Sequence, residues 1–199
     1  MQIKICGLFR QQDAEYVKEA MPDYAGFIFW KKSRRYVTIE QALHLKKLLV
    51  CKIKTVGVFV NEEPDKILQL FEEGIIDIAQ LHGQETEEDI LRLKASGKPI
   101  WKAVIIKKEA DVLKWKNTCA DCLLFDGGKG EGKSFSWELL SGIQRPFFLA
   151  GGMNTETIPM VKDLPNLFGI DVSSGVETEG LKDRRKILEI VKSVRDLSI

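Results

Sequence analysis

The sequence has no excess of charge of either sign, because 30 Lys and Arg residues balance 29 Asp and Glu residues in a chain of 199. Domains that bind nucleic acid commonly carry a basic surplus, so the balance indicates small-molecule partners and no nucleic acid. The sequence also lacks any apolar run near the about 18 residues that a membrane-spanning helix needs. Its start, Met1–Cys6, has neither the charged beginning nor the long apolar centre of a secretory signal. We therefore expect a cytoplasmic protein with no membrane partner.

Cysteine is scarce as well, with four residues at positions 6, 51, 119 and 122. They are too few and too unevenly spaced for a secreted disulfide framework, so we expect free thiols. Cys119 and Cys122 fit the C-x-x-C pattern, but a redox pair usually begins a helix and a zinc site needs further ligands. This pair leads into an apolar strand pattern instead, and the chain has only two histidines. We interpret the pair as structural and predict no metal site.

Short apolar runs alternate with segments of helical periodicity along the whole chain. The runs predict strands at Ile3–Cys6, Ala25–Trp30, Thr55–Val60, Ile76–Leu81, Ile100–Ile105, Cys122–Phe125, Pro146–Ala150 and Phe168–Val172. The periodicity predicts helices at Asp13–Ala20, Ile39–Val50, Pro64–Glu73, Glu85–Ala95, Ala110–Lys116, Thr155–Lys162 and Leu181–Leu197, with a weaker signal at Trp137–Leu140.

Eight strands that alternate with helices require parallel pairing and right-handed crossovers. Two α/β architectures satisfy this requirement, a closed eight-stranded barrel and an open doubly wound sheet. A barrel usually needs about 250 residues, but the loops here are short enough to fit one into this chain. The strand count favours a single (β/α)8 TIM barrel, with residues 1–199 as one domain and the functional loops at the carboxyl ends of the strands.

Alternation along each strand predicts which side chains point into the barrel. The inward residues are expected to be Lys4 and Cys6 on the first strand, Gln80 and His82 on the fourth, Lys102 on the fifth, and Asp171 and Ser173 on the eighth. Closure makes the first and eighth strands neighbours. We predict that Lys4 and Asp171 form an ion pair there, because either charge buried alone would cost several kcal/mol.

Two successive strand ends resemble a phosphate cup. The segments Phe147–Gly152 and Phe168–Gly175 are apolar runs that stop at small residues. Glycines let backbone N–H groups turn toward one point, and a following helix presents its positive amino terminus, so an anion can bind there without a cationic side chain. Each segment alone is equally consistent with an ordinary turn. Their occurrence in neighbouring units favours a phosphate site.

Three other strand ends carry reactive groups, Cys6, His82 and Asp126. A thiol acts as a base only as thiolate, and Lys4 next to it on the same face would favour that form. The alternatives are a small buried apolar residue for Cys6 and a solvated turn residue for Asp126. Arg34 and Arg35 follow the second strand and either grip a substrate carboxylate or form a solvated cationic turn.

The segment Gly127–Ser134 fits the P-loop pattern G-x-x-x-x-G-K-[ST]. A P-loop leads into a substantial helix, whereas only a short segment separates this one from Pro146. We favour a glycine-rich lid over the mouth of the barrel.

Eight segments together resemble phosphoribosylanthranilate isomerases of tryptophan biosynthesis. They are Lys4–Gly7, Gly26–Phe29, Ser33–Val37, Val56–Asn61, Gln80–Gly83, Gly132–Trp137, Ala150–Asn154 and Asp171–Glu177, and they keep their order from end to end. The resemblance implies a barrel enzyme without a cofactor that performs an Amadori rearrangement of a phosphosugar, as a monomer or a homodimer.

The resemblance also implies roles for residues. The general base falls on Cys6 and the general acid on Asp126, so we expect the pKa of Cys6 to be lowered and that of Asp126 to be raised. Arg35 is implied as the contact of the anthranilate carboxylate. Further substrate-binding residues are expected to be His82, with Gly151, Gly152, Ser173, Ser174 and Gly175 at the phosphate. Two departures from the family pattern are Glu131 in place of a lid glycine and Arg34 in place of a common proline.

Two alternatives differ in function. One is a phosphosugar-binding or nucleotide-binding barrel without activity. The other is the barrel isomerase that acts on an aminoimidazole ribotide in histidine biosynthesis, which uses carboxylates for both roles and has two similar phosphate sites. The first half of this chain shows no second glycine-serine cup.

Overall fold

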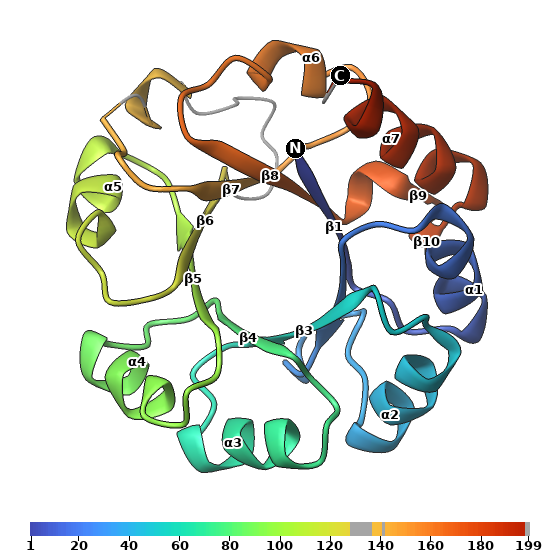
Figure 1. Cartoon of the computed structure of the whole chain (residues 1–199), viewed down its shortest axis with the longest axis horizontal. Coiled ribbons are helices and arrows are strands. Elements are labelled where there is room, and N and C mark those ends of the chain that lie inside the picture. Colours follow the sequence, from blue (N-terminus) through green and yellow to red (C-terminus); the bar gives the residue numbers. More distant parts are fainter. Residues whose placement is uncertain (128–136, 141, 198–199) are drawn as a thin grey trace.

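The computed structural model describes residues 1–127, 137–140 and 142–197. Eight parallel strands pair in chain order and close into a barrel through hydrogen bonds between the first and the last (Figure 1). The strands are β1 (Gln2–Cys6), β2 (Tyr24–Ile28), β3 (Lys54–Phe59), β4 (Ile78–Leu81), β5 (Ile100–Ile105), β6 (Cys122–Asp126), β7 (Phe147–Ala150) and β8 (Leu167–Val172). The predicted (β/α)8 barrel is confirmed.

Helices surround the barrel and shield the outer faces of its strands (Figure 1). They are α1 (Gln11–Ala20), α2 (Ile39–Leu48), α3 (Pro64–Glu72), α4 (Glu87–Lys94), α5 (Glu109–Trp115), α6 (Ile158–Val161) and α7 (Arg184–Asp196), with short 3-10 helices η1 (Trp137–Leu140) and η2 (Ser174–Val176). Within the described ranges, no helix has the length and apolar character to cross a membrane.

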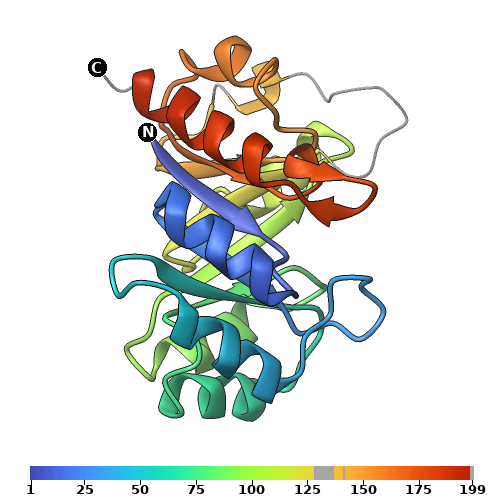
Figure 2. The same ribbon diagram turned by 90° about the vertical axis from the view of Figure 1, so that its right-hand side faces the viewer.

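The last helix begins later than predicted, because a hairpin precedes it. Strands β9 (Glu177–Thr178) and β10 (Leu181–Lys182) pair in antiparallel fashion. Helix α7 then starts after Asp183, whose carboxylate accepts hydrogen bonds from the first-turn N–H groups and so caps the helix. Figure 2 shows this hairpin and the loop after β2 at the end of the barrel opposite both termini. Helix α6 is likewise shorter than predicted, a single turn inside the expected range.

The interior of the barrel is apolar at one end and polar at the other. Tyr24, Trp101 and Phe148 lie near the amino ends of their strands, with the centroid of Trp101 5.1 Å from that of Tyr24 and 4.8 Å from that of Phe148. These rings fill the floor of the barrel. The polar inward residues lie nearer the carboxyl ends of the strands. Because the rings close the amino end, a ligand can reach the polar residues from the carboxyl ends.

The predicted ion pair between Lys4 and Asp171 is confirmed. These residues are direct partners in the register of β1 and β8. The ammonium of Lys4 lies 3.0 and 2.9 Å from the two carboxylate oxygens of Asp171. Lys4 is fully buried and Asp171 is 8% exposed, so each charge is compensated mainly by the other instead of by water.

The predicted inward orientation of Lys102 is wrong. Its neighbours Trp101 and Ala103 belong to the interior cluster, so Lys102 points outward from β5. Its ammonium donates hydrogen bonds to the Gly83 carbonyl and to the Glu85 carboxylate, 2.8 Å away. The physical reason is that the large Trp101 ring fills the barrel, while a buried carboxylate outside it is available to pair with the ammonium.

We expect the Lys4 and Asp171 pair to be strongly coupled in stability. Lys4→Met or Asp171→Asn alone should lower the free energy of unfolding by about 3 to 5 kcal/mol, because each leaves one buried charge unpaired. Combining Lys4→Met with Asp171→Leu should cost less than the sum of the single effects. Urea unfolding at pH 7 measures these values, with Lys66→Met at the exposed pair with Glu62 as the control. Additive losses in the double variant would contradict the coupling.

Candidate active site

Four side chains with groups that can transfer protons or form hydrogen bonds lie at the mouth of the barrel. Cys6 and Asp126 are the last residues of β1 and β6, and His82 and Ser173 come directly after β4 and β8. Each lies two residues beyond an inward-facing position: Lys4 precedes Cys6, Leu124 precedes Asp126, Gln80 precedes His82 and Asp171 precedes Ser173. Alternation therefore aims all four toward one axis, as predicted for Cys6, His82 and Ser173, and Asp126 joins them.

Cys6 lies beside Lys4 in a space that a glycine leaves open. A Cβ atom on Gly26 of β2 would stand only 2.7 Å from the Cys6 sulfur and 3.2 Å from the Lys4 ammonium. Position 26 therefore has to be glycine for the thiol and the ammonium to meet. The carbonyl of Cys6 also accepts a hydrogen bond from the Ser173 hydroxyl at 3.2 Å, which joins β1 to the loop after β8.

The expectation of a lowered pKa for Cys6 is wrong, because the structure gives the opposite direction. The residue is only 6% exposed. Burial raises the pKa of the Cys6 thiol and outweighs the attraction of Lys4, and Asp171 adds to the rise. Burial alone would lower the pKa of Lys4, but Asp171 and Cys6 outweigh it and raise the pKa. Lys4 therefore stays charged beside a protonated thiol.

Asp126 lies between His82 and the glycine turn after β7. One carboxylate oxygen is 3.5 Å from the Nε2 atom of His82. A Cβ atom on Gly151 would lie 2.8 Å from the other oxygen, and Gly151 has a left-handed φ of 82°. Burial lowers the pKa of His82 despite the attraction of Asp126, so the imidazole is neutral at pH 7. The contact is therefore between a carboxyl group and a neutral ring.

The predicted phosphate cup consists of two loops in contact. Gly151 and Gly152 after β7 have left-handed φ values of 82° and 70°, and both are exposed at the surface. Ser174 and Gly175 begin the 3-10 helix η2 after β8. A Cβ atom on Gly175 would lie 2.0 Å from the Met153 carbonyl, so only glycine lets the two loops approach this closely. Short polar turns of this kind suit an anion.

Arg35 is held by a residue that the sequence analysis did not single out. Its guanidinium donates to both carboxylate oxygens of Glu177, at 2.6 and 2.7 Å. Lys182 of β10 donates to the same carboxylate at 2.8 Å and to the Ser173 carbonyl at 3.0 Å. Glu177 ends the last of the eight segments that resemble the isomerase family, but nothing in the sequence indicates a contact between residues 142 positions apart.

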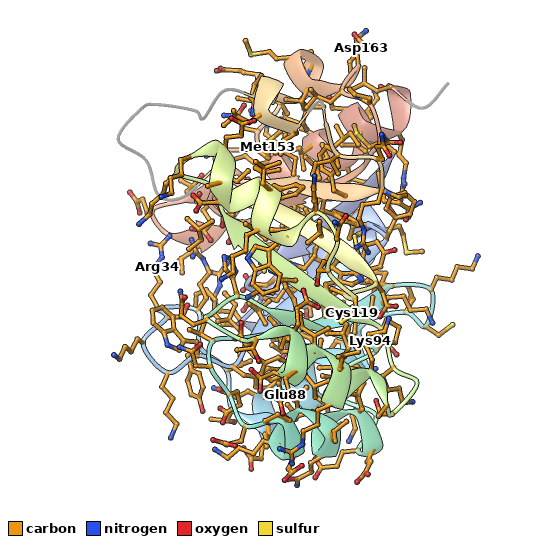
Figure 3. All side chains as sticks on the ribbon, turned by 90° about the vertical axis from the view of Figure 1, so that its left-hand side faces the viewer. Arg34, Glu88, Lys94, Cys119, Met153 and Asp163 are labelled. Atoms are coloured by element: carbon orange, nitrogen blue, oxygen red, sulfur yellow. The ribbon has the colours of Figure 1, made fainter. Side chains whose placement is uncertain are left out.

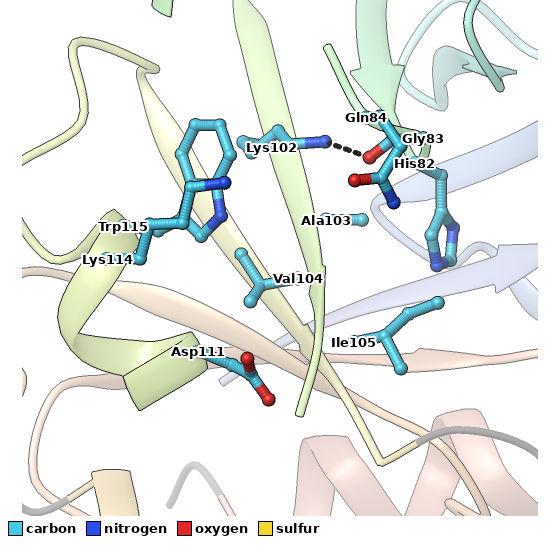
Figure 4. A pocket seen from close by; sticks show the side chains of 10 residues that line it. All are labelled: His82, Gly83, Gln84, Lys102, Ala103, Val104, Ile105, Asp111, Lys114 and Trp115. Atoms are coloured by element: carbon cyan, nitrogen blue, oxygen red, sulfur yellow. Dashed lines mark hydrogen bonds between the residues drawn. The ribbon is translucent and has the colours of Figure 1, made fainter. Parts of the chain in front are cut away.

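A separate cleft of about 170 Å³ opens between the loop after β4 and helix α5 (Figure 4). Lys102 and Trp115 form its wall, and the dashed line in Figure 4 marks the hydrogen bond from the Lys102 ammonium to the Gly83 carbonyl, 2.9 Å long. His82 lies at its edge and belongs to the mouth of the barrel as well. The cleft therefore borders the site without containing Cys6 or Asp126.

The C-x-x-C pair lies away from this site. Figure 3 places Cys119 near Lys94, at the opposite end of the barrel axis from Arg34. The Cys119 sulfur lies 2.9 Å from the Glu87 carboxylate, and burial raises the pKa of Cys122 to about 12. All four cysteines are free thiols, as expected. The proposed lid, including Glu131, falls on residues 128–136, outside the described residues.

The fold and the mouth together define a (β/α)8 barrel enzyme in which a thiol, a carboxyl group, an imidazole and two glycine-containing turns meet at the carboxyl ends of the strands. Residues 3–193 match the family model described as N-(5'phosphoribosyl)anthranilate (PRA) isomerase. The chain belongs to this family of isomerases.

Individual relatives agree over nearly their whole length. The N-(5'-phosphoribosyl)anthranilate isomerase of Thermoanaerobacter sp. (strain X514) is 42% identical over 99% of this chain and 99% of its own. A solved phosphoribosyl anthranilate isomerase in complex with reduced 1-(o-carboxyphenylamino)-1-deoxyribulose 5-phosphate is 34% identical, with a TM-score of 0.87 over 98% of this chain and 99% of that one. Monomers generated from the dimeric enzyme of Thermotoga maritima are 36% identical, with the same TM-score and coverage.

The raised pKa of Cys6 predicts its reactivity. Only thiolate reacts with iodoacetamide, so alkylation of Cys6 should keep accelerating at pH values where alkylation of free cysteine has levelled off. Peptide mass spectrometry of quenched samples gives the rate at this residue alone. Lys4→Met should slow the reaction further at each pH, because it removes the cation that favours thiolate. A Cys6 rate that reaches its plateau below pH 8 would contradict the assignment.

Proposed function

We propose that this chain isomerises N-(5'-phosphoribosyl)anthranilate to 1-(2-carboxyphenylamino)-1-deoxyribulose 5-phosphate by an Amadori rearrangement. The observation that carries the proposal is the meeting of a thiol, a carboxyl group and a glycine-serine turn pair at one barrel mouth. The family membership of the chain supports the same reaction.

In the proposed reaction Asp126 is the general acid. It gives a proton to the ring oxygen of the ribose, the bond from that oxygen to C1 breaks, and the anthranilate nitrogen forms an iminium ion with C1. The neighbouring His82 is neutral at pH 7, because burial lowers its pKa. The Nε2 atom of this neutral ring lies 3.5 Å from the Asp126 carboxyl group, beside the group proposed to transfer the proton.

Cys6 is the proposed general base. As thiolate it removes the proton from C2 of the ribose, and the electron pair of that bond moves to form an enolamine, which tautomerises to the ketone. Burial keeps Cys6 mainly protonated in the free chain, so the competent molecules are those whose thiol has lost its proton to solvent. Lys4 stabilises that thiolate directly. The rate should therefore rise with pH while Cys6 ionises.

Binding is assigned to the groups around the acid and the base. Arg35 contacts the ring carboxylate, His82 faces the substrate beside Asp126, and the phosphate sits on Gly151, Gly152, Ser173, Ser174 and Gly175. The solved relative holds a ligand that carries both a carboxyphenyl group and a 5-phosphate, which supports two anionic anchors at the mouth. The reaction needs proton transfers only, so the proposal includes no cofactor.

The proposal extends to the setting of the enzyme. The substrate is a small phosphosugar and nucleic acid is no partner, in line with the balanced charge of the chain. We place the protein in the cytoplasm as a single domain, residues 1–199, that is a monomer or a homodimer. The dimeric relative supports the second state.

Two substitutions test the roles of the acid and the base. Cys6→Ser and Asp126→Asn should each lower kcat by about 100-fold to 10,000-fold, the usual effect of removing a general acid or base. The loss of substrate fluorescence measures turnover when phosphoribosylanthranilate is generated in place. Affinity for the reduced product analogue should stay within about threefold, because neither substitution touches the two anionic anchors.

Matched controls are Cys51→Ser and Asp163→Asn, which carry the same changes at exposed positions. Both should turn over substrate at the parent rate. If the Cys6 and Asp126 variants also kept the parent rate, the assigned roles would be wrong. If the parent chain bound the analogue without turnover, the chain would be a phosphosugar-binding barrel.

A further inference from the structure

The guanidinium of Arg35 is fixed from one side by a buried carboxylate. Arg35 is 12% exposed and Glu177 is 4% exposed in their side chains. The two hydrogen bonds run from Nε and Nη2 of Arg35 to the two oxygens of Glu177. A Cβ atom on Gly7 would lie 2.5 Å from Cδ of Arg35, so the stem of this side chain packs directly on the turn that follows Cys6.

A guanidinium group has two edges that can each bind a carboxylate in bidentate fashion. Glu177 takes the edge formed by Nε and Nη2. The Nη1 atom makes no hydrogen bond within the described ranges of the chain. The edge formed by Nη1 and Nη2 is therefore available to a second carboxylate while Glu177 stays in place.

The charges around Glu177 favour such a second carboxylate. Three cationic side chains donate to this one carboxylate, because Arg34 contacts it at 2.5 Å in addition to Arg35 and Lys182. The cluster therefore keeps a net positive charge. Burial would raise the pKa of Glu177, but the hydrogen bonds from Arg35 and Lys182 outweigh it and lower the pKa, so Glu177 is ionised at pH 7.

The same cluster reaches the loop of the phosphate cup. Lys182 is buried between the Glu177 carboxylate and the Ser173 carbonyl. Glu177 thus lies in a chain of contacts that runs from Arg35 to the backbone of Ser173. The spacing of the two proposed anchors for the substrate is set in part by this chain.

We propose that Glu177 is a positioning residue that aims the free edge of Arg35 at the ring carboxylate of the substrate and so makes the site selective for carboxylate-bearing aryl amines. The inference rests on the proposed function, because it takes Arg35 as the carboxylate contact. Glu177 itself does not touch the substrate.

The test compares two ligands, the reduced product analogue and the same compound without its ring carboxylate. Isothermal titration gives both affinities for the parent chain, Glu177→Gln and Glu177→Asp. The preference for the carboxylate-bearing compound should fall about tenfold in Glu177→Gln, the effect of losing one well-placed charged hydrogen bond. Glu177→Asp keeps the charge but shortens the side chain, so it should also lose preference. Glu179→Gln, an exposed residue two positions away, is the matched control.

Kinetics provide a second measurement. In Glu177→Gln the KM for phosphoribosylanthranilate should rise about tenfold while kcat stays within about threefold, because the reacting groups are untouched. A residue that only stabilises the hairpin would weaken both ligands equally and leave their ratio unchanged. The ratio is taken within each variant, so it does not depend on the folded fraction. If Glu177→Gln does not fold, the ligand ratio of Glu177→Asp tests the inference.

An unchanged ratio in a variant that folds would overturn the inference. The proposed function would stand in that case, provided that the parent chain converts the substrate. If the parent chain neither converts the substrate nor binds either compound, the proposed function fails and the role of Glu177 fails with it.

Discussion

The buried contact between Lys4 and Asp171 is the interaction on which the rest of the site depends. It crosses the seam where β1 meets β8, so it forms only when the barrel is closed. Lys4 also faces the thiol of Cys6 and is the nearest cation that can stabilise a thiolate there. Without Asp171 the ammonium would have to leave the interior or lose its proton. Closure of the fold and the proposed activation of Cys6 as a base therefore depend on one ion pair.

Glycine positions without side chains determine the shape of the mouth as much as the reactive side chains do. Gly26 leaves the space in which Cys6 meets Lys4, and Gly151 leaves the space beside Asp126. Below these groups the aromatic floor of Tyr24, Trp101 and Phe148 closes the barrel. A substrate can therefore approach Asp126 and Cys6, the proposed acid and base, from the carboxyl ends of the strands, where the two glycine turns and Arg35 lie.

The features that could be predicted from the sequence are those that depend on local patterns. Alternation and strand count sufficed for the barrel, and closure then predicted the partner of Lys4. The prediction that Lys102 points inward was wrong, because alternation does not show which face of a strand is inner when both sequence neighbours, here Trp101 and Ala103, are apolar. The contact of Arg35 with Glu177 and the hairpin that places Lys182 depend on tertiary packing, which no spacing in the sequence encodes. Burial decides the pKa of Cys6, and burial is a property of the folded chain.

A protonated Cys6 is compatible with catalysis if the order of proton transfers is considered. In the proposed reaction Asp126 acts first, and ring opening produces an iminium ion next to the C2 proton. That positive charge adds to the charge of Lys4 at a site that is shielded from water, where charges act strongly on each other. Both cations favour the thiolate form of Cys6 at the step that needs a base. The molecules that react are those whose thiol has already lost its proton to solvent, and in them the iminium charge adds to that of Lys4 in holding Cys6 as thiolate until it takes the C2 proton.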